Sequence, residues 1–192
     1  GPIAQSDSGV IMQFRKFQLR SLIQGFYDQS VNMMISDTIT VYLRKNFSPY
    51  ETADSSRSIL NSAGYGEFSF SKAAGSQVYY YQIRHRNSLA TWSRAAGELF
   101  SLSNAAFDFT DSDSKAFGNN LKLKGSKYCI YNGDVNTDGI LDLTDLVMVF
   151  NDALNISSGY LVSDINGDDF TDLSDLIIVY NNASEFVTKI IP

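Results

Sequence analysis

The sequence predicts a mainly β protein with a small α-helical part, in which an antiparallel β-sandwich is followed by two loop–helix units. Short alternating apolar runs, separated by Gly, Ser, Asn and Asp at intervals of about a dozen residues, fill the first two thirds of the chain. An acidic loop then occurs twice, 30 residues apart, and an apolar run follows each copy. Seven or eight strands of this kind are typical of a sandwich, and a long apolar run behind a polar loop favours a helix.

The strand pattern is clearest in residues 38–44. Ile39, Val41 and Leu43 share one face there, because successive side chains of a strand point to opposite sides. Polar and aromatic residues lie between them and face the other side. Further strands are predicted at residues 11–20, 21–27, 67–70, 77–86, 98–110 and 121–124.

A glycine-punctuated stretch lies in the middle of this region. It reads LNSAGYGEFSF over residues 60–70 and continues through Gly75 to VYYYQI at residues 78–83. The stretch resembles the short glycine turn and following strand of transthyretin-like or carboxypeptidase-regulatory-like modules of secreted bacterial proteins. This resemblance implies a sandwich fold and no chemistry.

The duplicated loops read DVNTDGILDLTD at residues 134–145 and DINGDDFTDLSD at residues 164–175. In each, oxygen-bearing side chains occupy positions 1, 3, 5, 9 and 12, and position 7 offers a backbone carbonyl. A hard cation with six to eight oxygen ligands requires this spacing, so each loop is predicted to bind one Ca²⁺ in the manner of an EF-hand. The predicted ligands are Asp134, Asn136, Asp138, Ile140, Asp142 and Asp145 for one ion, and Asp164, Asn166, Asp168, Phe170, Asp172 and Asp175 for the other.

The sixth position of each loop must turn the chain sharply. Gly139 supplies the positive φ in the first copy, and Asp169 stands there in the second, where Asp is one of the few other residues that tolerate it. An alternative is an Asx-rich turn that only caps a helix. Repetition in register, with apolar runs at residues 146–150 and 176–180, favours calcium and predicts a helix after each loop.

The paired loop–helix units, with Asp at position 12 and a spacing near 30 residues, resemble the type I dockerin module. The resemblance covers about residues 128–192. It implies a secreted module that folds on calcium and binds a cohesin partner through loop positions 10 and 11 and along the helices. Those positions hold Leu143 and Thr144, and Leu173 and Ser174, where dockerins usually carry small polar pairs. The two leucines favour packing inside the protein, or against a neighbouring domain, over a recognition surface.

Charge is divided unevenly along the chain. Residues 1–132 contain 14 Lys and Arg against 10 Asp and Glu, whereas residues 133–192 contain 1 against 11, within totals of 15 and 21. The acidic part would repel itself without a cation, which is typical of folding coupled to metal binding. Net acidity argues against a nucleic-acid partner, and no apolar run is long enough to span a membrane. Cys129, the single cysteine, excludes an intrachain disulfide and is expected to be buried.

Candidate catalytic groups are scarce, and no enzyme activity is predicted. His85 is the only histidine and is expected on the surface or rim, with no nucleophile motif in the chain. Asp108, Asp111 and Asp113 lie in a polar stretch that is typical of a solvated loop. Trp92 and the three tyrosines of residues 79–81 offer a carbohydrate-stacking platform as an alternative, although part of that run must face the core.

The sequence therefore predicts two domains, a β-sandwich at residues 1–125 with an arm at residues 1–10, and a dockerin-like calcium module at residues 126–192. Their short connection predicts that the module is docked on the sandwich. No signal-peptide pattern begins the chain, so a mature or truncated product is expected. We expect a non-catalytic secreted or cell-surface protein for attachment or assembly through a protein partner. The alternatives are a self-assembling filament or surface-layer subunit, whose arm adds to the sheet of another copy, and a carbohydrate-binding accessory for a cell-surface glycan.

Overall fold

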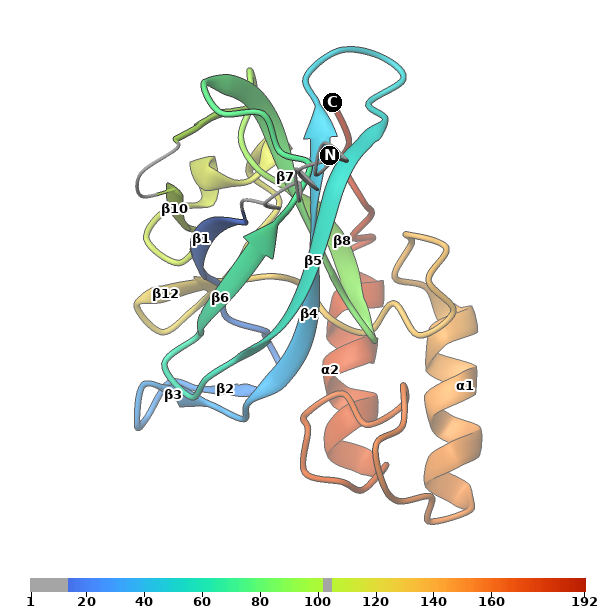
Figure 1. The fold of residues 1–192 in the computed structure, drawn as a ribbon. Helices are drawn as coiled ribbons and strands as arrows, with labels where there is room; N and C mark the ends of the chain where they lie inside the picture. The colour runs from blue at the N-terminus through green and yellow to red at the C-terminus, as the bar shows by residue number, and fades with distance from the viewer. Residues whose placement is uncertain (1–13, 102–104) are drawn as a thin grey trace, which may run out of the picture.

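The computed structural model describes residues 14–101 and 105–192. A β part and two helices lie side by side, and the helices stand next to the ends of strands β4 and β8 (Figure 1). The predicted arm at residues 1–10 lies outside the described residues. The chain is therefore mainly β with two small helices, as the sequence predicts.

Two sheets build the β part. The larger has the strand order β5-β4-β7-β8, with β9 paired to β7, and the smaller has the order β10-β1-β6. The strands of the larger sheet are β4 (Asp37–Lys45), β5 (Thr52–Leu60), β7 (Gln77–His85), β8 (Ser88–Trp92) and β9 (Glu98–Phe100), and those of the smaller are β1 (Arg15–Arg20), β6 (Tyr65–Phe70) and β10 (Ala105–Asp108). Their pairings are antiparallel except for β1 with β10, which is parallel. This arrangement is consistent with the predicted sandwich, apart from the parallel pair.

Alternating side chains of both sheets form the core. Ile39, Val41 and Leu43 of β4 are at most 1% exposed, as their spacing predicts. The smaller sheet contributes Phe17 and Leu19 of β1, which are buried in the same hydrophobic cluster. Fully burying a large apolar side chain stabilises a fold by about 1.5–3 kcal/mol, so this shared core holds the two sheets together.

Four strand predictions were wrong or incomplete. β5 was missed because its sequence, TADSSRSIL, has no apolar alternation, with Ala53, Ile59 and Leu60 as its only apolar residues, and its backbone pairing with β4 makes it a strand. β8 was also missed. Residues 98–110 form two strands in different sheets, because β9 pairs with β7 and β10 pairs with β1. Residues 21–27 contribute only the start of a short hairpin, β2 (Tyr27–Asp28) and β3 (Met33–Met34).

A second hairpin, β11 (Lys122–Lys124) and β12 (Lys127–Cys129), leads towards the helices, after two 3₁₀ turns at Asp113–Lys115 and Phe117–Asn119. The hairpin crosses the boundary expected between residues 125 and 126. Cys129 and Ile130 pack into the sandwich core, and burial raises the pKa of the Cys129 thiol to about 12. The buried cysteine agrees with its predicted role as a small apolar residue.

Both acidic loops lead into helices, as predicted. α1 (Leu143–Leu154) begins after Asp142, and α2 (Leu173–Ser184) begins after Asp172. The helices pack on each other through Val149 and Val179, which are fully buried. The described residues include no helix that is long and apolar enough to cross a membrane.

The two loop–helix units are joined by reciprocal backbone hydrogen bonds. In the first loop, the Leu141 N–H donates to the Val187 carbonyl (2.9 Å), which follows α2. In the second loop, the Thr171 N–H donates to the Ser157 carbonyl (2.9 Å), which follows α1. Each loop is thus paired with the segment behind the other helix, and the two units form one body.

Candidate functional site

The oxygen-bearing side chains of the two loops occupy equivalent places. The position 12 carboxylate of each loop accepts hydrogen bonds from the backbone N–H groups of positions 2, 3 and 9, at 2.7–3.2 Å. The position 3 amide accepts from the N–H of position 5, and the position 5 carboxylate accepts from the N–H of position 7. The sequence repeat is therefore also a repeat in three dimensions. In each loop, hydrogen bonds from backbone N–H groups to the loop's own side chains hold the backbone in its curved conformation.

The predicted turn at position 6 is confirmed in both loops. Gly139 has φ = 89° and Asp169 has φ = 70°. Their N–H groups donate to the position 1 carboxylates, Asp134 and Asp164, at 3.3 Å in each case. The left-handed turn brings position 6 back over position 1 and closes the loop.

Four carboxylates of these loops are buried. Asp134, Asp145, Asp164 and Asp175, at positions 1 and 12, are at most 3% exposed. Burial raises the pKa of Asp134 to about 6 and raises the pKa of Asp145 and Asp175 above their usual range. Buried carboxylates in this state need a positive partner, because removing a charge from water without compensation is costly.

Within the described ranges, no ion pair reaches a carboxylate of the first loop, and no group of three or more His, Cys, Asp or Glu side chains is arranged to hold a metal ion. The capping alternative accounts for positions 9 and 12, because Asp142 and Asp172 cap the helices in capping boxes with Asp145 and Asp175. The Asx-rich turn also uses the carboxylate at position 1, which accepts the N–H of position 6 in each loop.

Asn87, just after β7, ties both loops to the sandwich. Its carbonyl accepts from the N–H groups of Gly133 (2.6 Å) and Asp134 (3.1 Å), where the first loop begins. Its side-chain amide donates to the carbonyls of Val162 (3.1 Å) and Asp164 (2.8 Å), where the second loop begins. One fully buried residue therefore fixes the starts of both loops.

Two more buried asparagines complete this junction. The Asn132 amide donates to the Ile165 carbonyl (2.6 Å) and accepts from the Gly25 N–H (3.1 Å). The Asn182 amide of α2 donates to the Asn132 carbonyl (2.8 Å) and exchanges hydrogen bonds with Gln24. Both asparagines have no exposed surface. The expected docking of the helical part on the sandwich is confirmed, and buried amides carry it.

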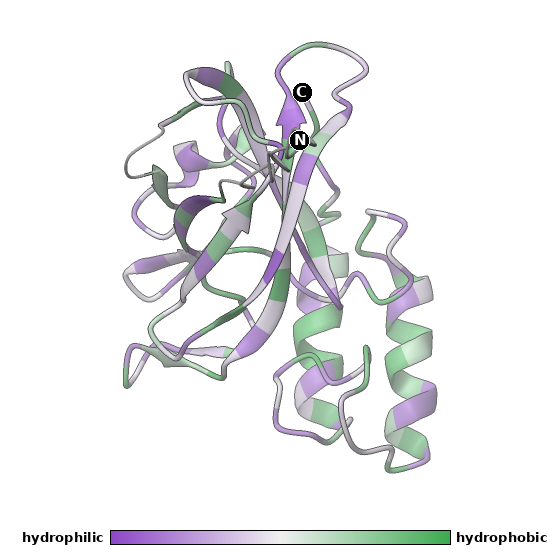
Figure 2. Ribbon diagram, in the orientation of Figure 1, coloured by the Kyte–Doolittle hydropathy of each residue, from purple (hydrophilic) through white to green (hydrophobic). Residues whose placement is uncertain are grey.

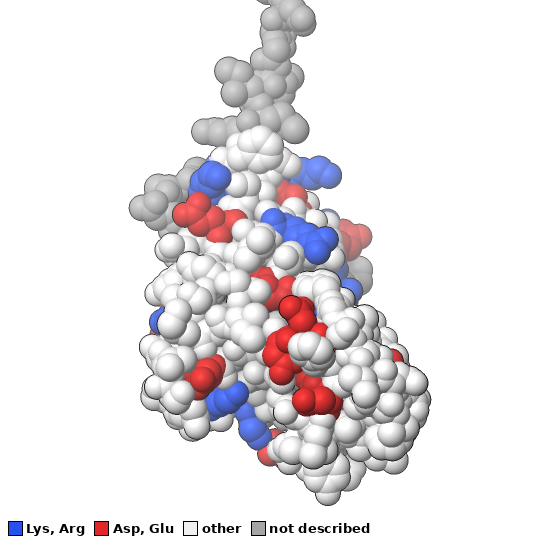
Figure 3. Space-filling view, turned by 90° about the horizontal axis from the view of Figure 1, so that it is seen from below, with Lys and Arg blue, Asp and Glu red and all other residues white. Residues whose placement is uncertain are grey.

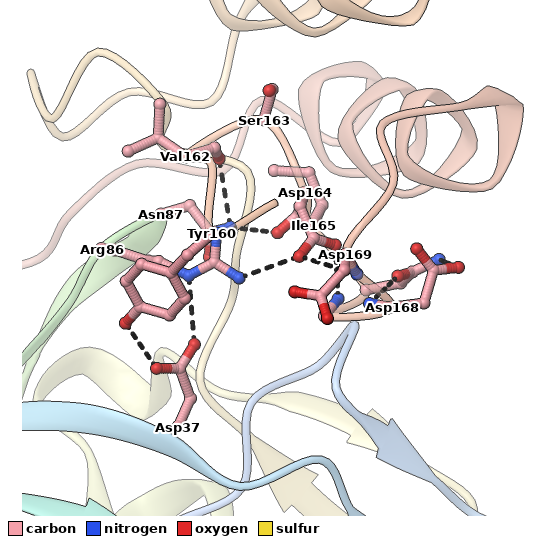
Figure 4. A network of polar contacts seen from close by, with 12 residues as sticks. Asp37, Arg86, Asn87, Tyr160, Val162, Ser163, Asp164, Ile165, Asp168 and Asp169 are labelled. Atoms are coloured by element: carbon pink, nitrogen blue, oxygen red, sulfur yellow. Dashed lines mark hydrogen bonds and ion pairs between the residues drawn. The ribbon is translucent and has the colours of Figure 1, made fainter. Parts of the chain in front are cut away.

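A charged network lies beside Asn87 (Figure 4). Asp37 of β4 contacts His85, Arg86 and Tyr160, and Arg86 also contacts Asp164 of the second loop. Burial alone would raise the pKa of Asp37, but hydrogen bonds from His85 and Tyr160 outweigh it and hold the pKa well below its usual range. The network joins the sandwich to the first ligand position of the second loop.

The expected position of His85 was wrong. The side chain is buried, its Nε2 lies 3.1 Å from Asp37 and its Nδ1 lies 2.8 Å from Ser88. Burial lowers the pKa of His85, so the ring is neutral near pH 7, with Nε2–H donating to Asp37 and Nδ1 accepting from the Ser88 hydroxyl. The ring is a structural part of the junction.

The carbohydrate-stacking platform was also wrong. Trp92, Tyr79, Tyr80 and Tyr81 are 7%, 4%, 6% and 2% exposed, so none offers a free ring face. The tyrosines lie on the central strand β7, where both faces are covered, and Tyr81 packs edge-on against Phe17. A sugar ring needs an exposed aromatic face, which these residues lack.

Leu143 and Leu173 do not pack inside the protein, contrary to the prediction. They are 69% and 68% exposed. Each begins a stripe of exposed apolar side chains at helical spacing, with Val147, Phe150 and Leu154 on α1 and with Ile177 and Tyr180 on α2. Among the described residues, 25 large hydrophobic side chains are exposed, and 16 of them lie in residues 133–192.

The helical surface is unusually free of charge. Apolar segments run along both helices (Figure 2), and from below the acidic side chains gather in one area beside a broad uncharged surface (Figure 3). Exposed apolar patches of this kind mark interaction sites.

Sequence reasoning found the loops and missed the residues that dock them. Asn87 and Arg86 lie in the run Arg84-His85-Arg86-Asn87, which was noticed only for its histidine. Asn132 and Asn182 carried no motif. Their neighbours in the sequence are largely polar or small, so their role becomes visible only when the partner segments are known.

No protein-family model matches the chain, and no curated protein matches it. Two solved structures do, both of a type II Cohesin-X-Dockerin complex from Acetivibrio cellulolyticus. The N-terminal interface mutant matches with TM-score 0.54 and 16% identity, and the C-terminal interface mutant with TM-score 0.53 and 15% identity. Each match covers 90% of this chain and 99% of the other. At this identity the likeness shows the fold. Each match leaves only a tenth of this chain uncovered, and the β part and the helical part are both larger than that. Each match therefore includes residues of both parts.

Proposed function

We propose that this chain is a non-catalytic attachment protein of the cell exterior, whose C-terminal helical pair is a dockerin-like module ordered by two calcium ions. The module presents its exposed apolar stripes to a cohesin-like protein partner. The observation that carries the proposal is the repetition of an apolar stripe on α1 and α2, directly behind two acidic loops.

The exposed stripes support a protein partner. Leu143, Val147 and Phe150 on α1 correspond to Leu173, Ile177 and Tyr180 on α2, and all six are 48–69% exposed. Neither helix has a basic residue in its last turn. Aliphatic and aromatic side chains without charge are typical of the buried centre of a protein–protein interface.

The loops support calcium. Oxygen atoms from positions 1, 3, 5, 7, 9 and 12 suit a hard cation, and the buried carboxylates of positions 1 and 12 require positive charge. The residues that would hold the two ions are those predicted from the sequence. Calcium would supply the charge that lets the acidic half fold, and extracellular calcium is concentrated enough to fill loops of modest affinity.

The structural matches support a role in protein–protein assembly, because both matched chains belong to cohesin–dockerin complexes. The matched complexes are named type II, whereas the loop sequences resemble type I.

Calorimetry tests the calcium sites. We expect two bound ions, with Asp134→Ala and Asp164→Ala each removing one, because position 1 is a direct ligand in this loop type. Asp111→Ala, an exposed carboxylate outside the loops, is the matched control and should leave both ions. Absence of any calcium heat in the unmodified protein would refute calcium binding.

Binding to purified cohesin modules, including the type II cohesin of the matched complex, tests the partner. We expect calcium-dependent binding to at least one of them. The double variant Val147→Asp and Ile177→Asp should abolish it while both calcium ions remain. Failure to bind any module, together with calcium-dependent polymers in sedimentation, would instead favour the self-assembling filament.

A further inference from the structure

Arg86 lies between two buried carboxylates that belong to different parts of the protein (Figure 4). Its Nε donates to Asp37 Oδ2 in the sandwich at 3.0 Å, and its Nη2 donates to Asp164 Oδ2 in the second loop at 3.1 Å. The Arg86 side chain is 10% exposed, and the two carboxylates are 4% and 1% exposed. Charges this deeply buried interact strongly, because little water screens them.

The guanidinium is held in place on both sides. It stacks on the ring of Tyr160 at 4.3 Å and lies 5.3 Å from the ring of Phe26. The Tyr160 hydroxyl donates to Asp37 Oδ1 at 2.6 Å. Tyr160 lies in the segment between α1 and the second loop, so residues of both parts fix the position of Arg86.

Arg86 bonds one oxygen of the Asp164 carboxylate. That oxygen, Oδ2, also accepts from the Asp169 N–H at 3.3 Å, and Oδ1 accepts from the Gly167 N–H at 2.7 Å. Asp164 is therefore held by three donors before any ion arrives. Its orientation and its charge are both set by the protein.

The first loop has no such partner. Asp134 accepts from the Gly139 N–H at 3.3 Å, and no ion pair reaches it among the residues that the structure describes. Lys189 lies over Gly139, but it forms no ion pair with Asp134. The two loops share the same pattern of oxygen-bearing side chains, but only the second has a position 1 carboxylate that is paired with an arginine.

We propose that Arg86 is a positioning residue that makes the second loop independent of calcium. It neutralises Asp164 and holds it against the sandwich, so the second loop stays ordered when calcium is removed, whereas the first loop depends on the ion. This inference rests on the proposed function, because it assumes that the loops bind calcium. The predicted order of the second loop in the calcium-free protein depends only on the Arg86 contacts.

Hydrogen exchange of the full-length chain in a calcium chelator tests the proposal. We expect amides of residues 134–145 to exchange about tenfold faster, or more, than those of residues 164–175, and both segments to be protected in millimolar calcium. Arg86→Gln should raise exchange of the second loop to the level of the first in chelator, with strand β4 still protected. Arg84→Gln, which replaces an exposed arginine at the end of β7, is the matched control and should leave the difference intact.

Equal exchange of the two loops in the unmodified, calcium-free protein would overturn the proposal, and so would an unchanged difference in Arg86→Gln. If Arg86→Gln unfolds β4 as well, Asp164→Asn decides, since it removes the charge of the same ion pair from the loop side. It should raise exchange of the second loop in chelator, and no change would overturn the proposal. Calorimetry of the unmodified protein separates this result from calcium binding, because lack of calcium heat refutes the proposed function and leaves the exchange comparison valid.

Discussion

Replacing Asn132 by alanine should break the junction between the sandwich and the helices. The side chain is fully buried, accepts from the Gly25 N–H and donates to the Ile165 carbonyl. Alanine leaves both backbone groups without these partners. An unsatisfied buried polar group costs about 1–3 kcal/mol, so the two together should lower the free energy of unfolding by about 2–6 kcal/mol.

The close approach of the two segments supports the upper part of this range. A Cβ on Gly25 would overlap the Ile165 carbonyl oxygen, so the sandwich and the second loop touch here through their backbones. A domain of ordinary stability has about 5–15 kcal/mol in total, so the expected loss is a large fraction of it.

Urea unfolding in millimolar calcium, followed by circular dichroism, measures the loss. We expect the helical signal of Asn132→Ala to unfold at lower urea than the sandwich, as the two parts lose their contact. Asn155→Ala is the matched control, because that exposed amide only donates to the Asn151 carbonyl, and it should change the free energy by less than about 0.5 kcal/mol. A loss below about 1 kcal/mol for Asn132→Ala would refute the role of the buried amides in docking.

Two further predictions concern the exposed leucines and the buried histidine. Leu143→Ser and Leu173→Ser should each cost no more than about 0.5–1 kcal/mol in excess calcium, because only a third of each side chain is buried. Val179→Ala, which truncates a fully buried residue, should cost about 2 kcal/mol, and equal losses in urea titrations would contradict the exposure. Acidification from pH 7 to pH 5 should lower the melting temperature in saturating calcium. Burial lowers the pKa of folded His85, so below about pH 6.5 the ring binds a proton more readily in the unfolded chain, which favours unfolding. His85 is the only histidine, so the decrease should be smaller in His85→Gln, and an identical decrease would refute its origin.

The sequence by itself determined the features that depend on neighbouring residues. The two loops, the positive φ at Gly139 and Asp169, the helices behind them and the buried face of β4 all follow from short spacings. Turn geometry and side-chain alternation act within a few residues, so the pattern is legible in the chain. The apolar stripes on the helices were equally legible as helical faces. What they could not reveal was whether another segment covers them.

Only the tertiary structure decided which faces are covered and which charges meet. Leu143 and Leu173 stay exposed because the helices pack on each other through Val149 and Val179, which turns position 10 of each loop outwards. Arg86 and Asp164 are 78 residues apart in the sequence, and no local pattern pairs them. Burial is a property of the whole packing arrangement, and a buried ion pair exists only after two distant segments have been brought together.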